Sequence, residues 1–275
     1  MAFFIEPFHY QFFVYGILAA VFVGATTGLL GTFIVLRKMS SIGHGLAHAV
    51  FGGAVVSYLL NTNFYIGASL WGFISSLLIR RISSQNKLGA DAAIGIVTTA
   101  SFALGVALIS KIPYFTRNIE AALFGNVLGV TPLDIAVIVS VFAITLLCIF
   151  LFYRSFLFLT FNEEIARAYK VPVEKLEILF SLILAASIIV SIQVLGVTLV
   201  AAMVVLPASC ARLLTNSFHR MIFLSVGIGI VCSFAGMYIS YYLDIASGAT
   251  IVLFAAFLFV VLSIYCSNNF FSIQK

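Results

Sequence analysis

Long apolar runs alternate with short polar connections along almost the whole chain. A helix that crosses the hydrocarbon core of a bilayer needs about 20 predominantly apolar residues. The runs that approach this length are 12–36, 46–60, 65–79, 92–110, 133–153, 177–192, 195–214, 221–242 and 248–266. They predict an all-α, polytopic membrane bundle with eight or nine transmembrane helices. The count stays open because only a short stretch around Gln193 and Gly196 separates two runs, and Pro207 interrupts the second.

Composition supports the same class of protein. Charged residues make up 8% of the 275 residues and apolar residues 63%, with a mean hydropathy of +1.20. Soluble domains carry about 25% charged residues and about 45–50% apolar residues. These values exclude a soluble enzyme, a nucleic-acid-binding domain, a disordered tail and a coiled coil. A β-barrel would show alternating segments of about 10 residues. Since no linker or charge run divides the chain, we expect one transmembrane domain over residues 1–275.

Basic residues gather on alternate connections between the predicted spans, and the positive-inside rule assigns those connections to the cytoplasm. The residues on this side are Arg37, Lys38, Arg80, Arg81, Lys87, Arg154, Arg167, Lys170, Lys175, Arg212 and Arg220. The opposite connections carry only Lys111 and Arg117, so we expect them to face outward. The N-terminal segment with Glu6 then lies outside, and nine spans would place Lys275 inside.

His44 and His48 stand out because ionisable side chains inside a span are rare and costly. Positions i and i+4 of a helix lie on one face, and two imidazoles on one face are suited to share a divalent ion. Small residues around the pair permit close approach of another helix. These are Gly43, Gly45, Ala47, Ala49, Gly52, Gly53 and Ala54. If a second copy of the chain supplied that helix, a two-fold axis would bring four imidazoles together, which suits zinc.

Two other interpretations of this pair compete with metal transport. Each histidine can be a lone polar residue that hydrogen-bonds to a neighbouring helix and binds no ion. The spacing also matches the two histidines of the HExxH metalloprotease helix. Gly45 occupies the place of the glutamate that activates the metal-bound water, so proteolysis is disfavoured.

Four carboxylates are candidates for a gate or an ion pathway. Asp91 lies at the cytoplasmic start of the fourth span, where a role in the first turn or cap of the helix is the favoured alternative. Glu120, Asp134 and Asp244 lie on the outer side, where they can attract cations or serve as ordinary loop and helix-start residues. The chain contains no P-loop, no GxGxxG after a strand and no Ser/His/Asp set. We therefore expect no ATPase site, no enzymatic activity and no permanently bound cofactor.

Several segments, taken together and in order, resemble the membrane permease of the ABC importers for zinc, manganese and iron. They are residues 28–53, 91–96, 123–126, 194–196 with 206–212, and 244–248. The resemblance implies a permease homodimer in the bacterial cytoplasmic (inner) membrane. It also implies an ABC ATPase subunit on the cytoplasmic face and an extracytoplasmic metal-binding protein that delivers the ion. Membrane lipid surrounds such a protein, and no nucleic acid takes part.

The same resemblance carries the metal residues of the family's second span onto His44 and His48. Family members usually have aspartate at the position of His44. Imidazole in place of carboxylate removes a negative charge and softens the site, which favours Zn²⁺ over Mn²⁺. The sequence is therefore interpreted as a zinc importer permease, with manganese or iron as the alternative cargo. A stand-alone channel or secondary transporter is the second alternative, although no carboxylate lies in the middle of a span, where such carriers often hold them.

Residues 162–173 resemble the short cytoplasmic helix through which such permeases contact the ATPase. The residues expected to serve this contact are Asn162, Glu163, Glu164, Ala166, Arg167 and Lys170. Physically, an asparagine cap, acidic residues in the first turn and basic residues near the end favour a helix that Pro172 closes. Many family members have glycine where Lys170 stands. The alternative is a solvated surface helix with no partner.

Overall fold

The computed structural model describes residues 6–60, 62–83, 89–110, 125–161 and 163–273. Over these ranges every regular element is a helix, which confirms the all-α prediction. The long helices are α2 (Gln11–Leu36), α3 (Ser41–Leu59), α4 (Phe64–Ser83), α5 (Ala90–Ile109), α7 (Pro132–Leu151), α10 (Val173–Leu195), α11 (Val197–Leu214), α12 (Phe218–Leu243) and α13 (Ser247–Ile273). The short ones are η1 (Glu6–His9), η2 (Val127–Gly129), α8 (Tyr153–Phe161) and α9 (Glu163–Ala168).

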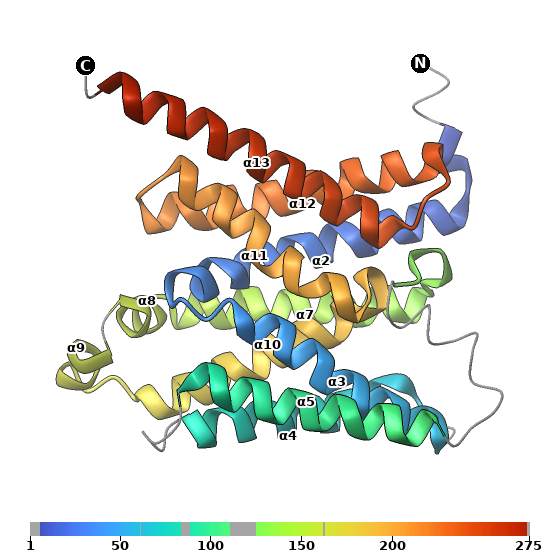
Figure 1. The fold of residues 1–275 in the computed structure, drawn as a ribbon, viewed down its shortest axis with the longest axis horizontal. Helices are drawn as coiled ribbons and strands as arrows, with labels where there is room; N and C mark the ends of the chain where they lie inside the picture. Colours follow the sequence, from blue (N-terminus) through green and yellow to red (C-terminus); the bar gives the residue numbers. More distant parts are fainter. Residues whose placement is uncertain (1–5, 61, 84–88, 111–124, 162, 274–275) are drawn as a thin grey trace.

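Each of the nine predicted runs corresponds to one long helix, and these helices lie side by side (Figure 1). Eight of them are long and apolar enough to cross a membrane. The remaining one, α4, has 20 residues but ends in Arg80 and Arg81, which lower its hydropathy. Among the described residues, η1 and the end of α13 lie at opposite ends of the bundle, as an odd number of end-to-end helices requires (Figure 1). The end of α13 shares its side with α8 and α9, in agreement with the predicted topology.

Two helices occupy the region where the sequence left the span count open. Gly196 separates α10 from α11 with φ +79°, a conformation that favours glycine. Pro207 lies inside α11 without ending it. On the outer side, the Asn126 backbone N–H donates to the Gln193 carbonyl (3.0 Å), so the segment before η2 is held against this break.

Helix α2 is the centre of the bundle, with α12, α11, α7 and α10 packed around it. Three glycines on α2 let neighbouring backbones come close. A Cβ atom on Gly24 would meet the Gly229 carbonyl, and one on Gly31 would meet the Val204 carbonyl. At Gly28 the approach allows the Ser225 hydroxyl of α12 to donate to the Gly28 carbonyl at 2.6 Å. Small residues therefore set the helix spacing here, as they do in many membrane bundles.

We expect Gly28→Ala to destabilise the bundle, because the added Cβ would lie 2.5 Å from the Ser225 carbonyl oxygen on α12. Overpacking of this kind costs about 1–3 kcal/mol. Gly227→Ala is the matched control, since a Cβ there meets nothing within 4 Å. It should stabilise its helix by up to about 1 kcal/mol. The measurement is thermal unfolding of the purified protein in detergent, and equal effects of the two substitutions would contradict the packing argument.

Candidate functional site

His44 and His48 lie one turn apart on α3, with ring centroids 4.4 Å apart and an interplanar angle of 73°. The predicted stacking on one helix face is therefore confirmed. His44 is exposed, and His48 is half-buried with its ring against Phe102 of α5, 5.0 Å between centroids. The pair thus lies at the edge where α3 meets α5, and His44 is the more exposed of the two side chains.

The other faces of α3 are used for packing. Gly45 lies against Ile94 of α5, and Gly52 lies against the backbone of Ser101 on the same helix. A Cβ on Gly53 would meet the Gly67 carbonyl of α4. Because the neighbouring helices pack against the glycine positions, the histidines lie on a face of α3 that no described helix covers completely.

Asp91 is tied to the beginning of this face. Its Oδ1 accepts a hydrogen bond from the Ser41 hydroxyl at 2.6 Å, which joins the first turn of α5 to the first turn of α3. The N-cap of α5 is Gly89, so Asp91 is a first-turn residue and not the cap. Ser41, His44 and His48 follow the i, i+3, i+7 spacing of one helix face. Asp91 therefore lies beside the stripe that carries the histidines.

The ligand set within one described chain is incomplete. In the ranges that the structure describes, no group of three or more His, Cys, Asp or Glu side chains is placed to hold a metal ion. Zinc prefers four ligands and manganese more, mostly oxygens. Two imidazoles on an open face need further donors to complete an ion's ligand shell, and water or another chain can supply them.

The neighbouring surface of α5 carries small, exposed residues, with the larger exposed side chains of Ile96 and Val106 between them. The small residues are Ala92, Gly95, Thr99, Ala103 and Ala107, which recur every three or four positions and so share one face. A Cβ on Gly95 would meet nothing within 4 Å. In Figure 1, α4 and α5 form one edge of the bundle and α13 the other. The α5 edge is thus shaped for close approach of a further helix.

Asp134 is a structural residue at the start of α7. It forms a capping box with Thr131, whose backbone N–H (2.8 Å) and hydroxyl (2.7 Å) donate to Asp134 Oδ2. The Tyr65 hydroxyl of α4 donates to Asp134 Oδ1 at 2.6 Å. The helix-start interpretation of this carboxylate is confirmed by these contacts. Glu120, its predicted companion on the outer side, lies outside the described residues.

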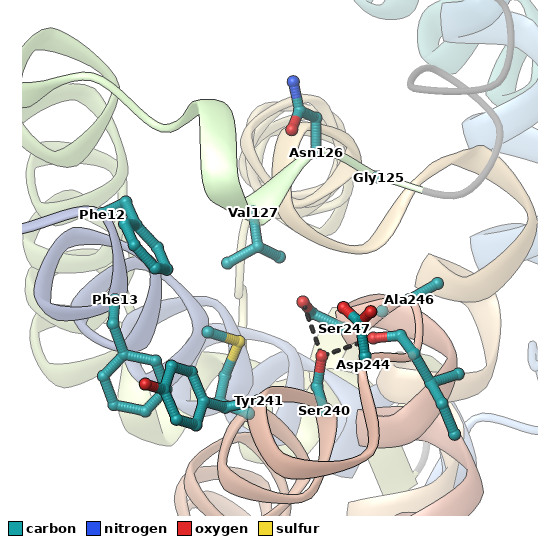
Figure 2. A pocket seen from close by; sticks show the side chains of 13 residues that line it. Phe12, Phe13, Gly125, Asn126, Val127, Ser240, Tyr241, Asp244, Ala246 and Ser247 are labelled. Carbon is teal, nitrogen blue, oxygen red and sulfur yellow. Dashed lines mark hydrogen bonds between the residues drawn. The ribbon is translucent and has the colours of Figure 1, made fainter. Parts of the chain in front are cut away.

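Asp244 borders an outer pocket of about 430 Å³ formed by η2 and the ends of α2, α12 and α13 (Figure 2). It ends α12 in the left-handed conformation, φ +52°. The Ser240 hydroxyl donates to the Ile245 carbonyl (2.6 Å) and lies 3.0 Å from the Ser247 hydroxyl, which orders the turn after Asp244. Other lining residues include Phe12, Phe13, Asn126 and Tyr241. Sequence analysis identified Asp244 but not this pocket, because its walls come from segments far apart in the chain.

Helix α9 is shorter than the cytoplasmic helix that the sequence predicted. Instead of 162–173, α9 covers Glu163–Ala168. It ends in a Schellman motif: Lys170 has φ +57°, its N–H donates to the Arg167 carbonyl (3.0 Å), and the Val171 N–H donates to the Ala166 carbonyl (3.0 Å). The left-handed residue therefore ends the helix, and Pro172 follows two residues later. The position where family members have glycine is the one that requires this conformation.

The predicted contact residues of α9 divide into two groups. Glu164, Arg167 and Lys170 are exposed, whereas Ala166 is fully buried and anchors α9 to the bundle. Asn162 lies outside the described residues. The exposed face also presents Ile165 (45% exposed) and Tyr169 (71% exposed), which sequence analysis did not select. Ile165 and Tyr169 lie four positions apart, and so share one helix face. This spacing was the sequence signal that could have identified them.

Comparisons with known proteins place this arrangement among transport proteins. Residues 9–266 match the ABC 3 transport family. The manganese transport system membrane protein MntC of Halalkalibacterium halodurans is 38% identical over 259 residues, 94% of this chain and 89% of that protein. The chelated iron transport system membrane protein YfeC of Yersinia pestis is 31% identical over 256 residues, 93% and 87% of the two chains. The structure of PsaBC from Streptococcus pneumoniae in complex with Fab is 34% identical with a TM-score of 0.85, and the match covers 94% of each chain.

We expect Lys170→Gly to raise the stability of the segment that follows α9, because a left-handed conformation costs an L-residue about 1–2 kcal/mol. The flexibility of glycine offsets about half of this gain. Lys170→Val should lower stability, since a β-branched side chain resists this conformation. Thermal unfolding of the purified variants measures both effects. Lys175→Gly, within the first turn of α10, is the control and should not stabilise; a gain there equal to that of Lys170→Gly would refute the conformational explanation.

Proposed function

We propose that manganese is the cargo of this chain, which belongs to the ABC 3 transport family and is a permease of the metal ABC importers. It is a multi-pass protein of the bacterial inner membrane, in keeping with its apolar helices. Manganese is supported by relatives that cover nearly the whole chain and are named for that metal. A relative named for iron makes Fe²⁺ the nearest competitor.

Zinc is a second candidate because of one observation. His44 and His48 stack at 4.4 Å and offer two imidazole nitrogens, and nitrogen ligands suit zinc better than manganese. In ABC importers, however, the ion delivered by the extracytoplasmic binding protein also decides the cargo. We therefore place manganese first, and treat the histidine pair as the feature that would admit zinc.

The proposed ion path runs along the open face of α3. His44 is exposed there, His48 is half-buried, and Asp91 lies beside the same stripe. A second copy of the chain, packed along the small-residue face of α5, would bring further donors toward His44. The homodimer is thus proposed as the unit that completes the ligand shell, and the ion is a transported substrate and not a resident cofactor.

The energy for transport is proposed to come from a separate ABC ATPase subunit that contacts α9. The exposed residues Glu164, Arg167 and Tyr169 give this short helix a mixed charged and aromatic surface, while buried Ala166 fixes it to the bundle. Closure of the ATPases would move α9 and switch the helix pair with the histidines between outward and inward access. An extracytoplasmic metal-binding protein would deliver the ion at the end of the bundle where η1 and η2 lie.

His48→Ala tests the path. Removing one of the two stacked donors should lower manganese uptake by about tenfold or more, since outer contacts of a metal site already contribute 10–100-fold. The measurement is ⁵⁴Mn uptake by cells that express the complete importer, with the amount of permease in the membrane held equal. His219→Ala removes an exposed histidine at the start of α12 and should leave uptake unchanged. Normal uptake by His48→Ala would exclude the histidine path.

His44→Asp tests the choice of metal. A carboxylate is a harder ligand than imidazole, so this variant should retain manganese uptake and lose sensitivity to competing zinc by about tenfold. Uptake of manganese, iron and zinc is measured singly and in competition for the wild type and the variant. If the wild type takes up zinc in preference to manganese, zinc replaces manganese as the cargo. An unchanged metal order in His44→Asp would show that His44 does not contact the ion.

A further inference from the structure

Arg37 is the C-cap residue of α2, and its guanidinium group links α2 to α8 and α10. Its side chain is only 7% exposed. Nε donates to the Thr160 hydroxyl of α8 at 3.3 Å, and Nη1 donates to Glu177 Oε1 of α10 at 3.1 Å. The guanidinium carbon also lies 4.6 Å from the ring centre of Phe180 on α10.

The two hydrogen-bond partners of Arg37 flank α9 on either side. Thr160 belongs to the last turn of α8, just before α9 begins at Glu163, and Glu177 belongs to the second turn of α10, after α9 has ended. In Figure 1, α8 and α9 lie together at the end of the bundle where α10 begins. One side chain from α2 therefore holds both ends of the segment that carries α9.

The packing beneath Arg37 joins the same helices through aromatic contacts. Phe33, one turn earlier on α2, is fully buried. Its ring centroid lies 6.0 Å from that of Phe156 on α8 and 6.1 Å from that of Phe180 on α10. Aromatic pairs prefer certain geometries, and hydrogen bonds from a guanidinium to a carboxylate add a defined polar geometry. Arg37 thus adds a directional polar contact to this aromatic junction.

On its other side, Arg37 leads directly into the helix with the histidines. The Lys38 N–H donates to the Val35 carbonyl (3.2 Å) and the Met39 N–H donates to the Ile34 carbonyl (3.0 Å), with Lys38 at φ +55°. This is a Schellman motif, and α3 begins two residues later. Because this turn is short and hydrogen-bonded, it can absorb little of a displacement between Arg37 and His44.

We propose that Arg37 is a positioning residue that transmits movement of the α9 segment to the histidine-bearing helix α3, through its contacts with Glu177 and Thr160. This inference rests on the proposed function, in which α9 contacts the ATPase and the histidines line the ion path. Without the Arg37–Glu177 contact, the α8–α10 ends would move past α2, and ATP would be hydrolysed without productive opening of the path.

The experiment measures ATP hydrolysis and ⁵⁴Mn transport by the complete importer in the same proteoliposomes. Arg37→Gln and Glu177→Gln should each lower the number of ions transported per ATP hydrolysed by about tenfold, a normal size for coupling between sites. ATP hydrolysis itself should persist. The charge-exchanged double variant, Arg37→Glu with Glu177→Arg, should regain much of the coupling, and Arg37→Lys should keep part of it. Lys175→Gln, which removes an exposed inner charge near Glu177, is the control and should couple normally.

The outcomes separate this inference from the proposed function. A wild-type importer that transports none of manganese, iron and zinc overturns both. If the wild type transports and the two single variants transport as many ions per ATP, only the role of Arg37 is overturned. Parallel loss of hydrolysis and transport, with no recovery in the charge-exchanged variant, also overturns it, because that is the result expected of a residue needed only for folding. Glu177→Gln retains the apolar packing around Phe180, so it gives the decisive measurement if Arg37→Gln does not accumulate in the membrane.

Discussion

The close approach of α2 to its neighbours is the constraint on which the rest of this structure depends. In a bilayer, helices gain little from the hydrophobic effect when they meet, because lipid tails are as apolar as their side chains. Contact must come from tight packing, and Gly24, Gly28 and Gly31 provide it against α12 and α11. The Ser225 hydroxyl adds a directional bond to the Gly28 carbonyl. With α2 held in this way, its cytoplasmic end has a defined position relative to α8 and α10.

The same packing rule explains why the histidines are accessible. Helix α3 directs Gly45, Gly52 and Gly53 toward α4 and α5, and the close contacts formed there leave His44 on an open face. The α5 surface beside it carries small residues together with the exposed apolar side chains of Ile96 and Val106. The open face and the incomplete ligand set are consistent with each other.

Much of the architecture followed from local information. Each of the nine apolar runs became one long helix, because backbone groups in a bilayer must be satisfied within a segment. The stacking of His44 on His48 followed from helix geometry alone. The role of Asp134 was also readable, since Thr131 and Asp134 have the spacing of a capping box before an apolar run. The end of α9 was predicted wrongly, because the left-handed conformation of Lys170 ends the helix before Pro172 is reached.

The sequence by itself determined where the long apolar helices lie, which connections carry the basic residues, and which helix face carries the two histidines. These properties depend on hydropathy, charge and helical period, all of which act within about 20 neighbouring residues. Only the tertiary structure decided that Tyr65 meets Asp134, that four segments enclose the outer pocket, and that Arg37 meets Glu177, 140 positions away. Those contacts depend on which helices pack together and at what spacing, and that choice was made by glycines whose partners lie on other helices.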